Sequence, residues 1–91
     1  MAIDPNDKVA LSGKGASLNR IGNYSQAMPY LDKALAIDPN YKEGLDNKGI
    51  TLYGLGNYTE ALQYFNKALA IDPNYKNAFN NKQIVLSKMR R

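Results

Sequence analysis

The chain repeats itself every 34 residues, and this period constrains its fold more than any other feature. The string Ile-Asp-Pro-Asn begins at Ile3, returns at Ile37 and returns again at Ile71. Gly-Asn-Tyr recurs with the same spacing, beginning at Gly22 and at Gly56. A period of this length is typical of proteins in which one supersecondary unit stacks on copies of itself, because a single unit cannot bury its apolar face alone. We therefore expect an array of stacked units.

Within each period the sequence predicts two helices separated by a sharp boundary. In the second period the apolar residues of the first half fall mostly on one helical face, and Gly56 follows where a left-handed residue would end the helix. Asn57 suits the N-cap of the next helix, and Glu60 stands where it would bond back to the Asn57 amide in a capping box. Pro73 should stop that helix, because the residue before a proline avoids helical geometry. The first period follows the same pattern.

The repeats divide the chain into two complete units and a partial third. We predict one all-α domain of five helices over residues 1–91, and its parts are a repeat at 8–41, a repeat at 42–75, a C-terminal half-repeat or capping helix at 76–91 and, at 1–7, the remainder of a preceding repeat. Because residues 2–6 look like the tail of a preceding repeat whose body is missing, we expect the chain to be a piece of a longer array or an engineered chain patterned on one.

Pro29 conflicts with this pattern. It lies beyond the first turn of the second predicted helix, where the matching residue of the next unit is Gln63. A proline there removes one backbone hydrogen bond and crowds the preceding turn, at a cost of roughly 3 kcal/mol. We expect either a kinked helix or one that begins later than its counterpart.

The composition argues against an enzyme. The sequence contains no cysteine and no histidine, which removes thiolate chemistry together with the commonest general base and transition-metal ligand. It also contains no phosphate-binding loop and no recognisable nucleophile–base pair. We therefore expect no catalytic residues, no bound metal and no cofactor.

Charge and hydropathy are those of a chain in aqueous solution. The formal net charge is +4, but lysine and arginine are spread along the whole chain, so we do not expect nucleic acid as a partner. No apolar stretch approaches the length of a membrane span, and the N-terminal residues lack the basic and apolar pattern of a signal peptide. The expected location is the cytoplasm, without membrane contact.

The repeating unit resembles the tetratricopeptide repeat, a 34-residue helical hairpin with small residues at fixed positions. Those positions and the terminating proline are Gly15, Ala27, Ala34 and Pro39 in the first unit and Gly49, Ala61, Ala68 and Pro73 in the second. Small residues are needed there because closely crossing helices leave no room for larger side chains. The resemblance implies a right-handed α-solenoid of antiparallel helical hairpins.

The chain also departs from the family pattern. The large aromatic residue expected early in each first helix is replaced by leucine at Leu11 and Leu45, and is present only as Phe79. The third unit carries Gln83 where a glycine is expected, which suits a last helix that receives no partner hairpin. We expect this last helix to act as a cap.

The resemblance further implies that the first helix of each unit lines a concave groove that binds a partner. The candidate groove residues are Val9, Ser12, Gly13, Ala16 and Asn19 from the first unit, Glu43, Asp46, Asn47, Ile50 and Tyr53 from the second, and Asn77, Asn80, Asn81, Ile84 and Lys88 from the last helix. Many are asparagines, whose amides can both donate to and accept from a peptide backbone. The alternative for each residue is a solvated helix face.

Some members of the family grip a terminal carboxylate with lysine, asparagine and arginine side chains in the groove. The corresponding positions here are Ser12, Ala16, Asn47, Asn77 and Asn81, so only Asn47 keeps the expected type. Without the cations a carboxylate would find little charge compensation. We expect that this chain does not bind chaperone tails by that clamp.

Six tyrosines recur at matched positions, which are Tyr24, Tyr30 and Tyr41 in one unit and Tyr58, Tyr64 and Tyr75 in the next. Tyr24 and Tyr58 stand where the family packs an aromatic ring between hairpins, so we expect a structural role for them. Tyr41 and Tyr75 are less usual for the family and should lie near the edge of the groove, where they are candidates for ligand contact.

The leading functional hypothesis is a protein–protein interaction scaffold that binds an extended peptide or a helix of a partner in the groove. The alternative is a structural or self-assembling fragment that has no ligand of its own. Such a fragment would form a homo-oligomer through exposed solenoid ends or by exchange of hairpins. The apolar ends are expected around Leu11 and Leu18 on one side and around Phe79, Ile84 and Met89 on the other.

Overall fold

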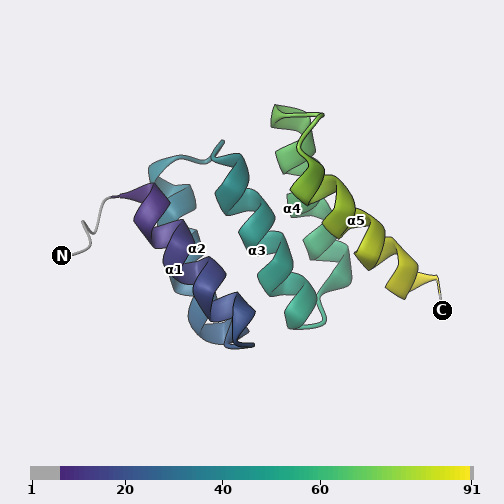
Figure 1. Cartoon of the computed structure of the whole chain (residues 1–91), viewed down its shortest axis with the longest axis horizontal. Helices are drawn as coiled ribbons and strands as arrows, with labels where there is room; N and C mark the ends of the chain where they lie inside the picture. The colour runs from purple at the N-terminus through teal and green to yellow at the C-terminus, as the bar shows by residue number, and fades with distance from the viewer. Residues whose placement is uncertain (1–6, 91) are drawn as a thin grey trace.

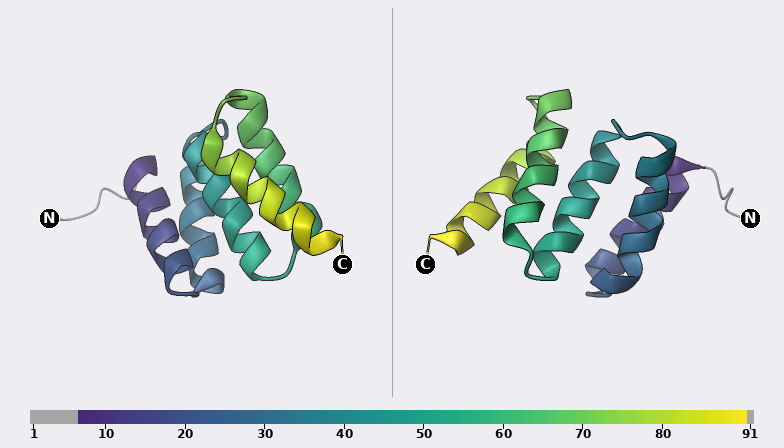
Figure 2. Two further views of the ribbon diagram at one scale, coloured as in Figure 1. Left: turned by 45° about the vertical axis from the view of Figure 1, so that its right-hand side comes forward. Right: turned by 180° about the vertical axis from the view of Figure 1, so that it is seen from behind.

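The computed structural model describes residues 7–90, and these residues form five helices and no strand. The helices are α1 (Lys8–Arg20), α2 (Tyr24–Ile37), α3 (Lys42–Gly54), α4 (Tyr58–Ile71) and α5 (Lys76–Met89). They form two layers, with α1, α3 and α5 side by side in one layer and α2 and α4 in the other (Figures 1 and 2). The expected all-α solenoid of helical hairpins is therefore confirmed. The predicted remainder of a preceding repeat at 1–7 lies, apart from Asp7, outside the described residues.

Each hairpin turns at a glycine in the left-handed region. Gly22 has a φ of +83° and Gly56 a φ of +85°, as expected for glycine caps. The next residue's backbone N–H donates back into the preceding helix, from Asn23 to the Leu18 carbonyl and from Asn57 to the Leu52 carbonyl, each at 2.8 Å. This is the Schellman arrangement, which satisfies carbonyl groups at the helix end.

The same hydrogen bonds explain why the predicted capping box is wrong. The Asn57 N–H, which Glu60 was expected to accept from, is already committed to the end of α3. Asn57 does occupy the N-cap position of α4, but its side chain makes no capping hydrogen bond. The C-terminal end of α3 thus uses the Asn57 N–H, which the capping box of α4 would need.

The second helices end before the prolines, as predicted. α2 ends at Ile37 and α4 at Ile71, and the residues before Pro39 and Pro73 are in extended conformation. α2 and α4 have the same length despite Pro29, so the expectation of a late helix start is wrong. α2 accommodates the proline within a helix of normal bounds.

Two matching clusters tie each unit to the loop before the next first helix. Lys8 Nζ lies 2.6 Å from an Asp38 carboxylate oxygen and 5.0 Å from the centre of the Tyr41 ring. Lys42 has the same relation to Asp72 and Tyr75, at the same distances. Each lysine, through this hydrogen bond, holds the pKa of its aspartate below the ordinary value. Tyr41 and Tyr75 therefore contact lysines of the chain itself.

The small residues sit where the helices approach most closely. Gly49 of α3 faces the ring of Phe65 in α4, and an added Cβ would lie 2.5 Å from a carbon of that ring. Gly15 of α1 faces Leu31 of α2 in the same way, at 2.6 Å. Because Phe65 is only 1% exposed, its ring has no free space into which to move.

Gly49→Ala should therefore destabilise the protein, although alanine favours helices more than glycine does. We expect a loss of about 1–3 kcal/mol from overpacking, measured as a lower midpoint in urea unfolding. The matched control is Gly13→Ala, because no heavy atom lies within 4 Å of the position a Cβ would take there. That change should stabilise α1 by roughly 0.5–1 kcal/mol. Shifts of the same sign in both variants would contradict the close contact.

The two ends of the array differ from one another. Leu11 was expected among the exposed residues of the N-terminal end, but it is only 5% exposed. It lies one helical turn before Gly15 and so shares the face that α1 turns toward α2. At the other end Phe79, Ile84 and Met89 are exposed as predicted, because within residues 7–90 no helix follows α5 to cover them.

The described helices are also too short or too polar for a membrane. Within residues 7–90 none combines the length and the apolar composition that crossing a bilayer requires.

Candidate functional site

The candidate groove residues all lie on α1, α3 and α5, which share one layer (Figure 1). The helices of this layer are joined by hydrogen bonds between polar side chains. The Asn47 side-chain amide donates to Ser12 Oγ at 2.9 Å, and the Asn81 amide donates to Asp46 Oδ1 at 3.0 Å. Both bonds connect residues 35 positions apart, so they form a ladder across successive first helices.

A second set of bonds reinforces the contact between α1 and α3. The Asn19 side-chain amide donates to the Asn47 carbonyl at 3.1 Å, and the Thr51 hydroxyl donates to Asn19 Oδ1 at 2.8 Å. Ser12, Asn19 and Asp46 are 2%, 8% and 3% exposed. These three predicted groove residues therefore act chiefly between helices, and the accessible surface consists of the other candidates.

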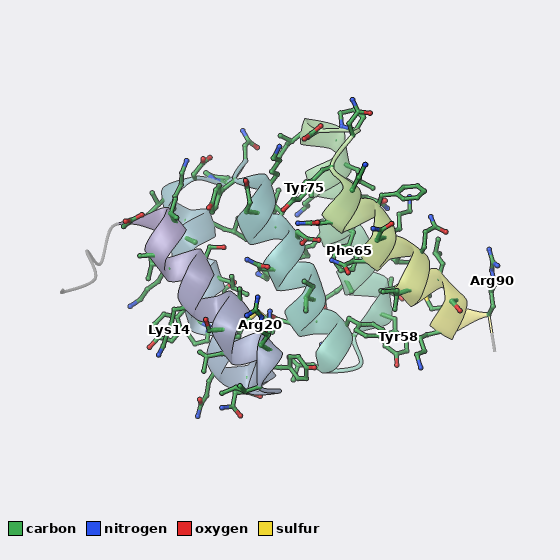
Figure 3. All side chains as sticks on the ribbon, viewed as in Figure 1. Lys14, Arg20, Tyr58, Phe65, Tyr75 and Arg90 are labelled. Carbon is green, nitrogen blue, oxygen red and sulfur yellow. The ribbon has the colours of Figure 1, made fainter. Side chains whose placement is uncertain are left out.

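A hollow of about 250 Å³ lies between α1 and α3. Its lining residues are Ala16, Asn19, Arg20, Asn47 and Ile50. Four of the five were expected on this surface, and Arg20 was not. Figure 3 shows the Arg20 side chain over the boundary between the two helices. Arg20 follows Ala16 by four residues, so extending the groove pattern by one helical turn would have found it.

A second hollow, of about 200 Å³, lies on the other side of α3, toward α5. Its lining residues are Tyr24, Ile50, Tyr53, Phe65, Asn81, Ile84 and Val85. Ile50 borders both hollows, so they are neighbours on one surface. The structure thus brings together Ala16, Asn19, Asn47, Ile50, Tyr53, Asn81 and Ile84 of the predicted set, although Asn19 is largely buried. Val9, Gly13, Glu43, Asn77, Asn80 and Lys88 are exposed but border neither hollow.

Tyr24 reaches the second hollow from α2. Its ring lies directly against Gly54, where a Cβ would overlap with it. The ring contact of Tyr58 is with Tyr53 of the same hairpin, with ring centres 5.4 Å apart, so packing of Tyr58 between hairpins stays a prediction. The expected packing of Tyr24 between hairpins is borne out, and the same ring also lines the hollow.

A larger hollow, of about 470 Å³, lies between α1 and α2 at the N-terminal end of the array. Its lining residues are Lys14, Leu18, Gln26, Pro29, Tyr30 and Lys33. In the second unit the matching surface is covered by α2. Asp32 of α2 forms an ion pair with Lys48 there, at 2.7 Å, and Lys48 Nζ lies 4.7 Å from the centre of the Tyr64 ring. This hollow lies between α1 and α2, outside the layer interface of α1, α3 and α5, so we do not count it as part of the groove.

Asp46 is a buried carboxylate without a cationic partner among residues 7–90. Burial raises the pKa of Asp46, the hydrogen bond from Asn81 opposes this, and the nearby charge of Glu43 raises it further. Because the pKa of Asp46 is higher in the folded than in the unfolded state, the protein loses stability as the pH rises from the ordinary value of 3.8 to the raised one, and the full penalty is present above it. Below the ordinary value of 3.8 the penalty is absent, because both states are protonated.

Asp46→Asn should therefore raise the melting temperature at neutral pH, because asparagine removes the buried charge and can still accept from Asn81. The advantage should shrink as the pH falls through the raised pKa of Asp46. Thermal unfolding of both proteins at a series of pH values measures this difference. Asp38 and Asp72 titrate in both proteins and cancel in the comparison. A difference that stays constant with pH would contradict an ionised Asp46 in the groove floor.

Metal or acid–base chemistry finds no support in the described residues. Residues 7–90 contain no cluster of acidic side chains that could hold a metal ion. The polar groups of the layer are amides and hydroxyls that bond to one another, and the hollows that they border are shallow and open to solvent.

A profile of the tetratricopeptide repeat family matches residues 9–41 and 47–75 of the chain. The chain is a tetratricopeptide repeat protein. The matched segments contain both glycine turns and both close glycine contacts described above. The predicted membership is thus confirmed. A comparison with curated proteins gave no significant match.

Solved structures of tetratricopeptide repeat (TPR) domains share its fold. The first TPR of Spaghetti (RPAP3) bound to the HSP90 peptide SRMEEVD is 19% identical, with a TM-score of 0.88 over 97% of this chain and 70% of that one. The first TPR domain of human RPAP3 is 20% identical, with a TM-score of 0.89 over 96% and 68%. The second, in complex with the HSP70 peptide SGPTIEEVD, is 22% identical, with a TM-score of 0.83 over 90% and 68%. At such identities the likeness concerns the fold.

Proposed function

We propose that this TPR protein is an interaction scaffold that binds an extended peptide or a helix of a partner protein on the layer formed by α1, α3 and α5. The observation that carries the proposal is the pair of adjoining hollows with Ile50 between them. Concave sites lined by apolar groups and a few fixed polar groups are the usual form of a ligand site. The hydrogen-bond ladder holds the three helices in place before a partner arrives, which limits the entropy cost of binding.

Exposed amides along the same layer support a polypeptide ligand. Asn77 and Asn80 are exposed on α5, and Asn47 and Asn81 are half-buried at the borders of the hollows. Amide side chains can bond to the N–H and C=O groups of a peptide backbone whatever its sequence. Two of the structural neighbours were solved with bound peptides, which agrees with use of this fold for peptide binding.

The structure also bears on the carboxylate clamp. Ser12 is buried and bonded to Asn47, and the Asn81 amide is bonded to Asp46. Three of the five clamp positions, Ser12, Asn47 and Asn81, therefore bond within the protein, and the set also lacks the expected cations. That this chain does not hold chaperone tails by that clamp stays a prediction.

The remaining expectations from the sequence complete the proposal. We propose a single domain with repeats at 8–41 and 42–75, a capping helix at 76–91, and no catalysis of its own. The helix bounds support this division. The lack of histidine and cysteine in the sequence supports a purely binding role. A cytoplasmic location stays a prediction.

Peptide selection against the immobilised protein tests the function. Peptides selected on the wild type should bind an Ile50→Lys variant at least about tenfold more weakly, because a charged side chain would stand between the two hollows. Ile37→Lys is the matched control, since Ile37 is exposed on α2 in the opposite layer. It should leave binding within about twofold. Equal binding to wild type and Ile50→Lys, with both variants folded by circular dichroism, would contradict the groove.

Self-assembly is the second candidate, favoured by the exposure of Phe79, Ile84 and Met89 on α5. If these side chains join copies of the chain, the mass measured by light scattering should rise with protein concentration, and Phe79→Glu should restore the monomer mass. A monomer mass at all concentrations would exclude this candidate.

A further inference from the structure

Arg20 is the one cation among residues 7–90 that borders either hollow on the layer formed by α1, α3 and α5. Lys8, Lys42 and Lys48 each form an ion pair with an aspartate of the chain. Among residues 7–90 Arg20 has no such partner, and its side chain borders the hollow between α1 and α3. Figure 3 shows its side chain near the boundary between α1 and α3.

The amides of this hollow are each partly committed to bonds within the protein. The Asn47 amide nitrogen donates one N–H to Ser12, and the Asn19 amide nitrogen donates one to the Asn47 carbonyl, so each keeps a single neutral donor. The charged donors of the hollow are the N–H groups of the Arg20 guanidinium, which form a planar fork. A fork of this kind matches the two oxygens of a carboxylate.

The charges on the neighbouring helix reinforce this choice. Glu43 and the buried Asp46 lie toward the N-terminal end of α3, and each would repel an acidic side chain. Arg20 lies at the C-terminal end of α1. An acidic group of a partner is thus favoured at Arg20 and disfavoured toward the other end of the layer.

The second hollow has a different character. Aromatic and aliphatic side chains make up most of its lining, among them Tyr53, Ile84 and Val85. The amide nitrogen of Asn81, a polar member of the lining, is bonded to Asp46. This hollow therefore suits an apolar side chain of the partner.

The separation between the hollows limits how the two groups can be spaced on a peptide. The hollows lie on opposite sides of α3 and share Ile50, so their centres are about one helix-to-helix distance apart. Packed helices are roughly 8–10 Å apart, and an extended peptide advances about 3.3–3.6 Å per residue. Two or three residues cover that distance.

We propose that the groove recognises an extended peptide in which an acidic residue stands two or three positions from a large apolar residue, with the carboxylate on Arg20 and the apolar side chain between α3 and α5. The inference rests on the proposed function and adds the class of peptide that the groove selects. A peptide carrying only one of the two groups loses one of the two contacts.

The test uses eight acetylated and amidated peptides of serine and glycine. Four carry one glutamate two or three positions before or after one leucine, and the other four carry glutamine in place of glutamate. Blocked termini make the side chain the only carboxylate. Binding to the wild type, Arg20→Gln and Arg90→Gln is followed by ¹H–¹⁵N correlation spectra. Arg90→Gln is the matched control, because it makes the same change in charge beyond the end of α5 (Figure 3).

At least one glutamate peptide should bind the wild type about fivefold more tightly than its glutamine partner. The largest changes in amide chemical shift should be those of Arg20 and Ile50. Arg20→Gln should remove the difference, and Arg90→Gln should keep it. A preference that survives in Arg20→Gln, or equal binding of both peptides to the wild type, overturns the carboxylate site while the groove remains a peptide site. If these peptides cause no change in the amide signals of the groove residues, while selected peptides of other sequence do, the proposed motif is overturned. Loss of groove binding for all peptides overturns the function itself.

Discussion

Replacing Phe65 with alanine is expected to lower the free energy of unfolding by about 3–5 kcal/mol. Phe65 is the largest of the fully buried side chains, and it fills the space that Gly49 leaves between α3 and α4. Because glycine has no side chain, α3 offers nothing at this point that could move in to fill the cavity. A loss of this size is a large fraction of the total stability of a small domain. Urea unfolding followed by circular dichroism measures it.

Phe79→Ala is the matched control, because Phe79 is the other phenylalanine of the sequence and is 53% exposed on α5. We expect a change within about 0.5 kcal/mol. Comparable losses in the two variants would mean that α5 contributes as much to the core as the contact between α3 and α4. An unfolded Phe65→Ala protein at zero urea would agree with the prediction, provided that Phe79→Ala is folded.

Pro29→Gln is expected to raise the free energy of unfolding by up to about 3 kcal/mol. Pro29 lies inside α2, where its ring cannot donate a backbone hydrogen bond to the preceding turn. α4 has the same bounds relative to its repeat and carries Gln63 at the matching position. Since Pro29 is exposed, the glutamine side chain would meet no packing constraint. The melting temperature measures the gain.

The reciprocal change, Gln63→Pro, tests the same reasoning in the other unit. Gln63 is exposed on α4, so the substitution alters the backbone and leaves the core untouched. Gln63→Pro should lower the free energy of unfolding by roughly the amount by which Pro29→Gln raises it. If Pro29→Gln leaves the melting temperature unchanged while Gln63→Pro lowers it, the backbone of α2 already accommodates the ring without cost.

Local sequence signals predicted the helix boundaries well, since these depend on single residues. Gly56 adopts the left-handed conformation and Pro73 follows an extended residue, as the pattern required. The capping box prediction was wrong because Asn57 has a single backbone N–H. That group donates to the Leu52 carbonyl and is therefore not left for the Glu60 side chain. The pattern Asn-x-x-Glu gives no sign that the preceding helix uses that donor first.

The candidate site was predicted less completely, because it depends on contacts between units. The repeat pattern placed Asn47, Ile50 and Asn81 on the correct layer. It gave no means of telling that Asp46 would be buried by the neighbouring helix, because burial there follows from how closely α3 and α5 approach. Arg20 was missed for a simpler reason, because the groove set of the first unit ended at Asn19 although Lys88, the residue that matches Arg20 two periods later, was included for the last helix.

The ladder between first helices gives the array a direction. In each step a first helix provides the acceptor and the next first helix provides the donor. The donor lies 35 residues after the acceptor, which is one residue more than the repeat period, as in Ser12 with Asn47 and Asp46 with Asn81. The two sides of a first helix are therefore not interchangeable, and contacts of this head-to-tail kind have no built-in stop. Asn80, at the acceptor position of α5, is exposed and is positioned to continue the series, whereas Gly13 provides no side chain to start it from the other side. A hairpin grafted after α5 would thus inherit the ladder, and one grafted before α1 would not.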